Sequence, residues 1–268
     1  MTAIEIDQVK LSLIRYSICT LVTNLQEYQL MLNSYKIAGF SEEFCEYIYV
    51  DNSRENKYDA YEGLNKMISS ARGQYIILCH QDIELKFDGI DILEKRILEI
   101  ERLDKNWGII SNAGGLNLKK VIERISHPTH ELNLGPFPMQ VKSVDENFIL
   151  LKKSANLGFS NNIKGYHMYG TDICILANAI GYSAWVVDFH LLHKSNGVVS
   201  DSFLQNKKEL ITKYNKAFQS RYIRSTCTKL YISGNRFRAA YMNTNFMIFL
   251  AKLVVKAKKR IKGDYNFE

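Results

Sequence analysis

The chain has 268 residues, of which 46% are hydrophobic and 24% are charged. This length and composition suit one large folded domain and exclude a disordered chain. No stretch approaches the ~18 uncharged apolar residues of a membrane span, and the N-terminus lacks the basic and apolar regions of a signal peptide. The five scattered cysteines, none of them in a C-x-x-C pair, favour a reducing compartment, so we expect a cytoplasmic protein.

β-rich runs alternate with helical patterns in the first half of the sequence. The predicted strands there are 17–22, 47–50, 75–79 and 107–110, and the predicted helices are 25–38, 58–71 and 90–103. All three prolines fall in the segment 127–139, which predicts a loop. After it we expect apolar runs at 140–144 and 148–151, a helix at 171–180 and a last strand at 184–189.

Strands that alternate with helices predict an α/β fold with a mixed, mostly parallel Rossmann-type sheet flanked by helices. Ligands of such sheets bind beyond the carboxyl ends of the strands. The polar residues that close the first three strands should therefore share one rim. These residues are Thr23 and Asn24, Asp51 and Asn52, and His80 and Asp82.

Three places along this rim and beyond it carry residues suited to chemistry. Asp82 ends His80-Gln81-Asp82 after the most apolar strand, and its carboxylate is a hard ligand for Mg²⁺ or Mn²⁺. Asp172, near the start of a predicted helix, is a candidate general base. His190 and His193 follow the last strand. Each of the acids also has a purely structural interpretation, as a turn residue or as a first-turn acid of a helix.

Taken in order, these segments resemble the GT-A glycosyltransferases, in particular their family-two-like bacterial branch. The resemblance covers residues 17–197. Its motifs are Thr20-Leu21-Val22-Thr23-Asn24, Tyr49-Val50-Asp51-Asn52-Ser53, Gly63-Leu64-Asn65 with Ala71-Arg72-Gly73, His80-Gln81-Asp82 in place of the family's D-x-D, Gly165 to Cys174 around Asp172, and His193-Lys194-Ser195-Asn196-Gly197. Because the first acid of D-x-D is missing here, the identity of the metal stays open.

The resemblance implies an inverting hexosyl- or N-acetylhexosaminyltransferase that uses a nucleotide-diphosphate sugar, with UDP as the expected nucleotide. Asp172 would be the base, and Asp82 with His193 would bind Mn²⁺ or Mg²⁺, with His80 and His190 as alternative ligands. The donor site would include Thr23, Asn24, Asp51, Asn52, Asn65, Gln81 and Asp145. Segment 127–139 would border a saccharide or lipid-linked saccharide acceptor, as in bacterial surface polysaccharide synthesis. A nucleotidyltransferase and a catalytically inactive nucleotide-sugar-binding protein are the alternatives.

The charge of the chain is concentrated at one end. Residues 211–263 contain 13 Lys or Arg and no acid. We therefore divide the chain into a catalytic domain, 1–210, and a basic helical extension, 211–268. On a helical wheel, residues 246–262 form an amphipathic helix with a basic polar face, which predicts peripheral binding to an anionic membrane surface at the inner face of the cell membrane. Docking of this helix on the catalytic domain is the alternative, and no nucleic-acid-binding module is recognisable.

Overall fold

The structure of the protein is a computed structural model that describes residues 13–195 and 200–262, with the side chains of the last helix described as far as residue 256. The chain forms two compact units that divide between Leu210 and Ile211. Each unit is described by itself. Of the segments discussed above, residues 196 and 197 lie outside the described part of the chain, as do the side chains of residues 257–262.

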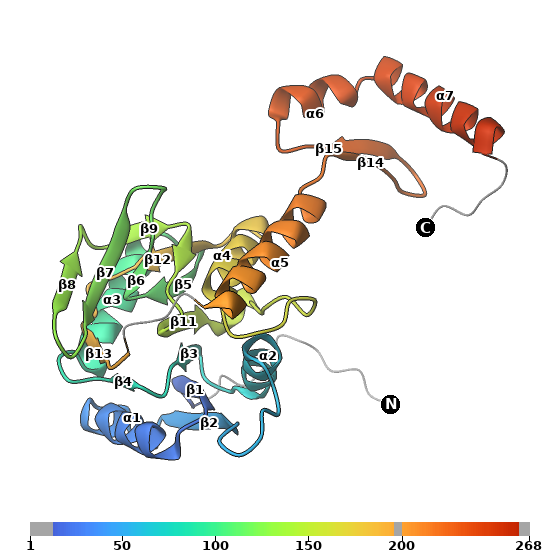
Figure 1. The fold of residues 1–268 in the computed structure, drawn as a ribbon. Helices are drawn as coiled ribbons and strands as arrows, with labels where there is room; N and C mark the ends of the chain where they lie inside the picture. The colour runs from blue at the N-terminus through green and yellow to red at the C-terminus, as the bar shows by residue number, and fades with distance from the viewer. Residues whose placement is uncertain (1–12, 196–199, 263–268) are drawn as a thin grey trace, which may run out of the picture. The chain divides into compact units, whose positions relative to one another are not determined.

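The first unit is built around a seven-stranded sheet with the order β2-β1-β3-β11-β5-β12-β9 (Figure 1). The strands are β1 (Tyr16–Val22), β2 (Cys45–Asp51), β3 (Tyr75–Cys79), β5 (Trp107–Ser111), β9 (Met139–Val141), β11 (Phe148–Lys152) and β12 (Ser183–Val186). Each of the apolar runs 17–22, 47–50, 75–79, 107–110 and 148–151 is a strand, as the sequence predicts. The last predicted strand is shorter than expected, because β12 ends at Val186.

The sheet is mixed in equal parts instead of mostly parallel. β1 pairs in parallel with β2 and β3, and β5 pairs in parallel with β12. β11 lies antiparallel between β3 and β5, and β9 lies antiparallel to β12. β11 fills the centre of the sheet because its first four side chains are all apolar and buried. A local apolar run predicts a buried strand, but it does not determine the direction of that strand.

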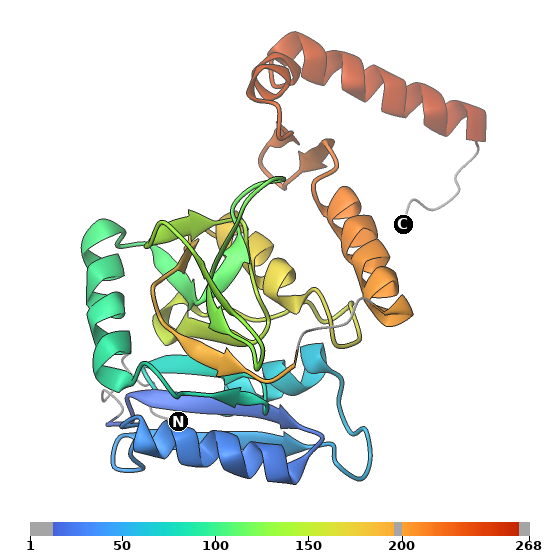
Figure 2. The same cartoon turned by 60° about the vertical axis from the view of Figure 1, so that its left-hand side comes forward.

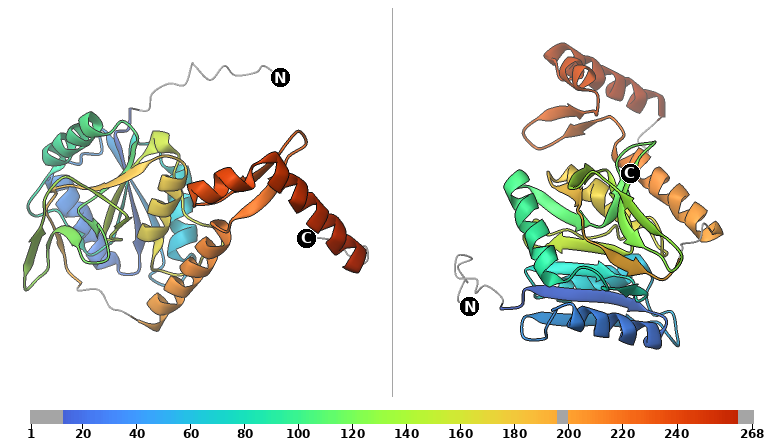
Figure 3. Two further views of the ribbon diagram at one scale, coloured as in Figure 1. Left: turned by 90° about the horizontal axis from the view of Figure 1, so that it is seen from above. Right: turned by 90° about the vertical axis from the view of Figure 1, so that its left-hand side faces the viewer.

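Helices cover both faces of this sheet. They are α1 (Leu25–Ile37), α2 (Ala60–Ser70), α3 (Ile90–Leu103) and α4 (Tyr169–Ala179), with a short 3-10 helix at Lys153–Ala155. Seen from above, α1 and α3 lie on one side of the strands, and α2 and α4 lie on the other (Figure 3). The side chain of Asn24 caps α1, and Gly39 ends it in a left-handed conformation at φ +96°. Figure 2 shows α1 running alongside β1 and β2.

A second, smaller sheet has the order β10-β6-β7-β13-β4, with β8 paired to β7. Its strands are β4 (Ile83–Glu84), β6 (Ala113–Gly115), β7 (Val121–Ser126), β8 (Glu131–Leu134), β10 (Ser143–Val144) and β13 (Leu191–His193). The sequence does not predict this sheet: β4, β6, β10 and β13 have only two or three residues each and are too short to show an alternating pattern. It is nevertheless this sheet that positions the candidate metal ligands.

Large aromatic side chains fill the core between the layers. Trp107, Tyr16, Phe40 and Phe148 are fully buried. Each such side chain removes 150–250 Å² from water, so together they contribute much of the hydrophobic stabilisation. This buried core holds the helices and strands of the first unit in place, and with them the polar residues at the strand ends.

The second unit contains a two-stranded hairpin and two helices. These elements are β14 (Arg221–Arg224), β15 (Lys229–Ile232), α6 (Arg236–Met242) and α7 (Asn245–Lys262), and they are preceded by α5 (Asp201–Ala217), which crosses the division between the units. α7 coincides with the helix predicted at 246–262. Among the described residues, none of the helices combines the length and the apolar character needed to cross a membrane.

Candidate functional site

Three side chains capable of metal ligation converge where the two sheets adjoin. His80 follows β3, Asp82 precedes β4, and His193 is the last residue of β13. Antiparallel pairing of β13 with β4 sets His193 opposite Ile83, the residue after Asp82. One potential ligand atom from each of the three lies within 4.8 Å of the others. The structure thus brings Asp82 and His193 together, as the sequence predicts, and adds His80 to them.

Nearby charges and hydrogen bonds set the protonation states of this cluster. The His193 Nε2 atom lies 3.4 Å from Asp82 Oδ2. Burial by itself would raise the pKa of Asp82, but the hydrogen bonds from His193 and Ser195 and the nearby imidazoles outweigh it and lower this pKa. Burial, followed by the proximity of His193, lowers the pKa of His80. Asp82 is therefore ionised and His80 neutral near pH 7, which are the protonation states that metal ligands require.

A hydrogen bond to Tyr169 also orients the imidazole of His80. Its Nε2 atom lies 2.8 Å from the hydroxyl of Tyr169, and its Nδ1 atom lies 4.0 Å from Asp82 Oδ1. This arrangement leaves Nδ1 as the atom directed to the cluster. Two imidazoles and one carboxylate form a softer donor set than the all-oxygen shell that Mg²⁺ prefers. The residues present fit a divalent transition-metal ion.

A cavity of about 310 Å³ opens beside the cluster, at the carboxyl ends of β1 and β3. This volume is at the lower end of the range for small-molecule sites. The polar side chains that line the cavity are Thr23, His80, Gln81, Asp82, Glu146, Tyr166, His167 and Tyr169. The predicted rim is therefore a real edge of the sheet with a cavity next to it.

Gln81 joins the ends of the two strands at this edge. Its Oε1 atom accepts hydrogen bonds from the backbone N–H groups of Thr23 and Asn24, at 2.7 and 2.9 Å. Its Nε2 atom donates to Thr23 Oγ1 and Glu27 Oε2. Gln81 thus fixes the turn between β1 and α1 against the end of β3, which shapes the floor of the cavity.

Three predicted donor-site residues lie at the same edge and use their side chains locally. Asn24 accepts the first N–H groups of α1. Asp51 accepts hydrogen bonds from the backbone N–H and hydroxyl of Ser53, at 2.9 and 2.6 Å, and these bonds lower its pKa. Asn52 is buried, with its amide bonded to the backbone of the following loop. Of the three, Asp51 keeps a second carboxylate oxygen without a bond to Ser53.

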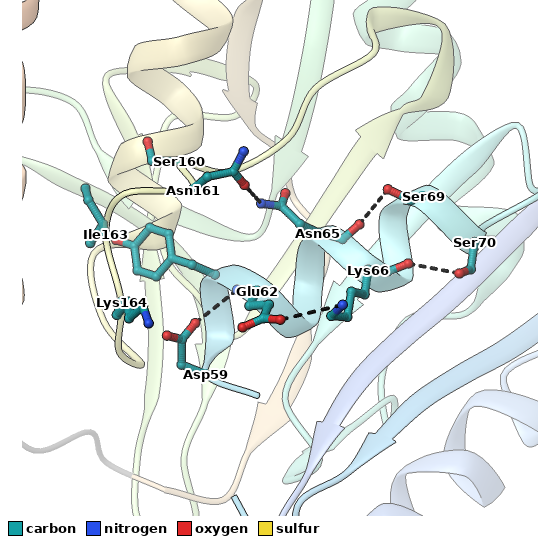
Figure 4. Close-up of a pocket in the computed structure, with 11 residues that line it drawn as sticks. Asp59, Glu62, Asn65, Lys66, Ser69, Ser70, Ser160, Asn161, Ile163 and Lys164 are labelled. Atoms are coloured by element: carbon teal, nitrogen blue, oxygen red, sulfur yellow. Dashed lines mark hydrogen bonds and ion pairs between the residues drawn. The ribbon is translucent and has the colours of Figure 1, made fainter. Parts of the chain in front are cut away.

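Asn65 is not part of this cavity. Its side chain bonds the backbone N–H and carbonyl of Phe159, and it lines a separate cavity of about 710 Å³ beside α2. Figure 4 shows Asn65 directed to Asn161, next to Ser160, Ile163 and Lys164. The assignment of Asn65 to the donor site therefore needs correction: its amide fixes the loop around Phe159 to α2.

Asp172 also differs from its predicted role. Its side chain is fully buried, at 0% exposure. The carboxylate accepts hydrogen bonds from the backbone N–H of Ser160 at 2.8 Å and from the Ser160 hydroxyl at 2.5 Å. A general base must reach the proton it removes. Asp172 faces the interior because α4 packs that side of its first turn on the core, so in this structure it is a structural acid.

Glu146 lines the cavity together with Asp82, and the sequence does not predict it. Its Oε1 atom accepts a hydrogen bond from the backbone N–H of Gly170, at 3.2 Å, at the start of α4. Burial raises the pKa of Glu146 to about 8; N–H groups at the helix start oppose this shift, and the neighbouring charge of Asp145 adds to it. The only sequence signal was the acid pair Asp145-Glu146 before β11.

Asp145 itself, the other half of that pair, is exposed, and its Oδ1 atom accepts hydrogen bonds from the backbone N–H and side-chain amide of Asn147, at 2.9 and 2.6 Å. It is not among the residues that line the cavity.

The remaining predicted histidine lies apart from the cluster. His190 is buried, bonds Ser126 Oγ at 2.8 Å and stacks on Phe87. His190 is therefore not a metal ligand in this structure. A different histidine, His127, lies beside the cluster, with its ring centroid 5.7 Å from that of His193 and its Nδ1 atom 3.0 Å from the carbonyl oxygen of Ser195. The beginning of segment 127–139 therefore borders the candidate site.

Comparison with known proteins bears on the fold. No protein-family model matches the chain. A curated protein of Fuscovulum blasticum, described as "ATP synthase subunits region ORF 6", is 28% identical over 236 residues, which cover 85% of this chain and 94% of that protein. Its description states a genomic position and no activity.

Solved structures also resemble the protein, and two of them are glycosyltransferase structures with a nucleotide or sugar nucleotide bound. GalNAc-T7 with UDP, GalNAc and Mn²⁺ matches with a TM-score of 0.53 and 9% identity, over 74% of this chain and 48% of that one. Residues 1–349 of S. aureus TarS in complex with UDP-GlcNAc match with a TM-score of 0.50 and 12% identity, over 75% and 67%. The chain thus spans about half the length of GalNAc-T7 and two thirds of the TarS fragment. It has the mixed α/β fold of the GT-A glycosyltransferases.

Proposed function

We propose that the protein is a metal-dependent glycosyltransferase that moves a sugar from a nucleotide diphosphate to an acceptor hydroxyl. The observation that carries this proposal is the cluster of His80, Asp82 and His193 beside a cavity at the carboxyl edge of the sheet. GalNAc-T7 and TarS, which share the fold, were solved with UDP and Mn²⁺ and with UDP-GlcNAc. UDP and Mn²⁺ are accordingly the first nucleotide and metal to test.

The residues of the cluster suit the leaving group of such a reaction. His80, Asp82 and His193 would hold the cation, and a bound cation neutralises the charge that develops on the departing diphosphate. Asp51, at the carboxyl end of the neighbouring β2, keeps a carboxylate oxygen that suits a ribose hydroxyl. Thr23 and Gln81 would border the donor from the floor of the cavity.

We assign Glu146 as the general base that acts on the acceptor hydroxyl. In its ionised form it takes the proton of the acceptor hydroxyl while that oxygen bonds to the anomeric carbon. The bond between this carbon and the diphosphate oxygen breaks, and the nucleoside diphosphate leaves with the bonding electrons. A single displacement of this kind inverts the anomeric configuration. Glu146 suits the role because it lines the cavity and because its pKa, about 8, lies close to the working pH of an enzyme.

Thermal unfolding in the presence of sugar nucleotides tests the proposal. UDP-, GDP- and dTDP-sugars are added with Mn²⁺ or with EDTA, and release of nucleoside diphosphate is then measured for those that bind. A ligand at a hundred times its Kd stabilises the native state by ~2.7 kcal/mol, which raises the midpoint by roughly 5–10 °C. We expect such a shift for at least one donor, and only with Mn²⁺.

Two matched variants test whether the metal-dependent shift of the midpoint arises at the cluster. Asp82→Ala should abolish the metal-dependent shift, whereas His130→Ala should keep it, because His130 is exposed and does not belong to the cluster. Equal shifts in Mn²⁺ and EDTA would argue against a metal site. Binding of a donor without any release of nucleotide, over a range of acceptors, would indicate an inactive sugar-nucleotide-binding protein instead.

A further inference from the structure

The second unit contains a groove between its hairpin and its last helix. The groove has a volume of about 450 Å³ and is lined by residues of β14, β15 and α7. Its apolar side chains are Tyr222, Ile223, Ile248, Ala251 and Val255. These are mostly aliphatic, so the floor of the groove suits hydrocarbon better than it suits the stacked bases of a nucleic acid.

Four cations line the same groove: Arg224, Lys229, Lys252 and Lys256. Residues 211–262, the described part of this unit, contain no acid, so no carboxylate of this part is available to pair with them. Lys229 and Lys252 even contact one another, and this contact is the chief cause of the lowered pKa of Lys229. Two ammonium groups held side by side repel each other unless an anion lies between or beside them. The charge of the groove is therefore complementary to a phosphate.

α7 adds an exposed apolar surface next to this charge. Phe246, Phe249, Leu253 and Val254 are 46–65% exposed. They belong to the side of the helix that the sequence predicts to be apolar, and within this unit that side is not packed on the hairpin. Large apolar side chains gathered on one helix face typically mark a surface that binds protein or membrane.

We propose that the groove between β14, β15 and α7 binds the phosphate headgroup of an anionic lipid, with the exposed face of α7 in contact with the acyl region. Lys229 and Lys252 donate hydrogen bonds to the phosphate, because an anion between two neighbouring ammonium groups removes their mutual repulsion. The aliphatic floor and the apolar face of α7 take up hydrocarbon, as interfacial helices do. A phosphate attached to a hydrophobic chain can bind both the cations and the apolar side chains of this surface, whereas a free phosphate can bind only the cations.

Flotation of the full-length protein with lipid vesicles tests this proposal independently of sugar transfer. Wild type should bind phosphatidylcholine vesicles that contain about one third phosphatidylglycerol, and it should not bind pure phosphatidylcholine. Binding should fade between roughly 0.05 and 0.5 M NaCl, because salt screens exposed charges. The variant Lys229→Gln/Lys252→Gln should bind at least ~10-fold more weakly, the effect expected for two lysines near an anionic surface.

A control variant distinguishes lipid binding at the groove from attraction by the net charge of the unit. Lys216→Gln/Arg236→Gln removes the same charge from exposed positions outside the groove, and it should weaken binding less than about threefold. Circular dichroism confirms that both variants are folded. Equal losses in the two variants would overturn the groove as the site. No binding of wild type to the anionic vesicles, tighter binding to single-stranded RNA, or binding to inorganic phosphate alone would overturn the lipid as the ligand.

Discussion

Substitution of Asp172 by asparagine separates the role predicted from the sequence from the role seen in the structure. If Asp172 were the catalytic base, Asp172→Asn would leave the fold intact and slow transfer by ~10²-fold or more. The structure instead shows a fully buried carboxylate that accepts two hydrogen bonds from Ser160. We therefore expect the variant to lose stability.

The magnitude follows from these two bonds. A hydrogen bond to a charged group contributes about 1.5–3 kcal/mol, and a buried donor left without its acceptor costs about 1–3 kcal/mol. Asparagine keeps one acceptor oxygen but turns an N–H₂ group toward the second donor. One of the bonds is therefore lost, at a cost of about 2–3 kcal/mol. At 2–4 °C per kcal/mol for a domain of this size, the unfolding midpoint should fall by roughly 4–12 °C.

The matched variant is Glu146→Gln, which keeps an acceptor oxygen for the N–H of Gly170. Its midpoint should change by no more than a few degrees, while transfer falls by ~10²-fold or more. Thermal unfolding followed by circular dichroism and a nucleotide-release assay at a temperature where both variants are folded measure the two effects. An Asp172→Asn protein with an unchanged midpoint and ~10²-fold slower transfer, next to an active Glu146→Gln protein, would refute this reasoning.

Three further results are expected. Asp82→Ala should weaken Mn²⁺ binding, measured by calorimetry, by at least ~10²-fold, because removal of a direct ligand costs more than loss of an outer hydrogen bond. Because the pKa of Glu146 is raised to about 8, kcat/KM should rise with pH through this value, and the rise should be absent in Glu146→Gln. The free energy of unfolding should fall as the pH rises from 4.5, the ordinary pKa of a glutamate, to about 8 and should level off above it, since between these values the folded state holds a proton that the unfolded chain has lost. Gly170→Ala should reduce the free energy of unfolding by about 1–3 kcal/mol in urea titrations, because its Cβ would lie 2.3 Å from a backbone oxygen, whereas Gly234→Ala, with nothing within 4 Å, should be neutral.

Much of the fold could be predicted from the sequence because its signals are local. The helix predicted at 90–103 has these same limits, since an amphipathic period over four turns is a strong signal. Asn24 and Gly39 mark the ends of α1 by the chemistry of helix caps. The shared edge at Thr23 and Gln81 follows from parallel strands, whose carboxyl ends point the same way.

The composition of the candidate site was decided by the tertiary structure. His193 joins Asp82, and His190 does not, because the two-residue pairing of β13 with β4 fixes which histidine faces the cluster. Asp172 faces the core because the packing of α4 sets the rotation of its first turn, and Glu146, which precedes β11, reaches the cavity, where it bonds the N–H of Gly170 at the start of that helix. Neither outcome has a local signal: short strands show no period, and an acid in a first helical turn has the same sequence pattern on either face. Which polar groups meet depends on register and packing between segments far apart in the chain, whereas the sequence pattern itself records only which segments are helices and buried strands.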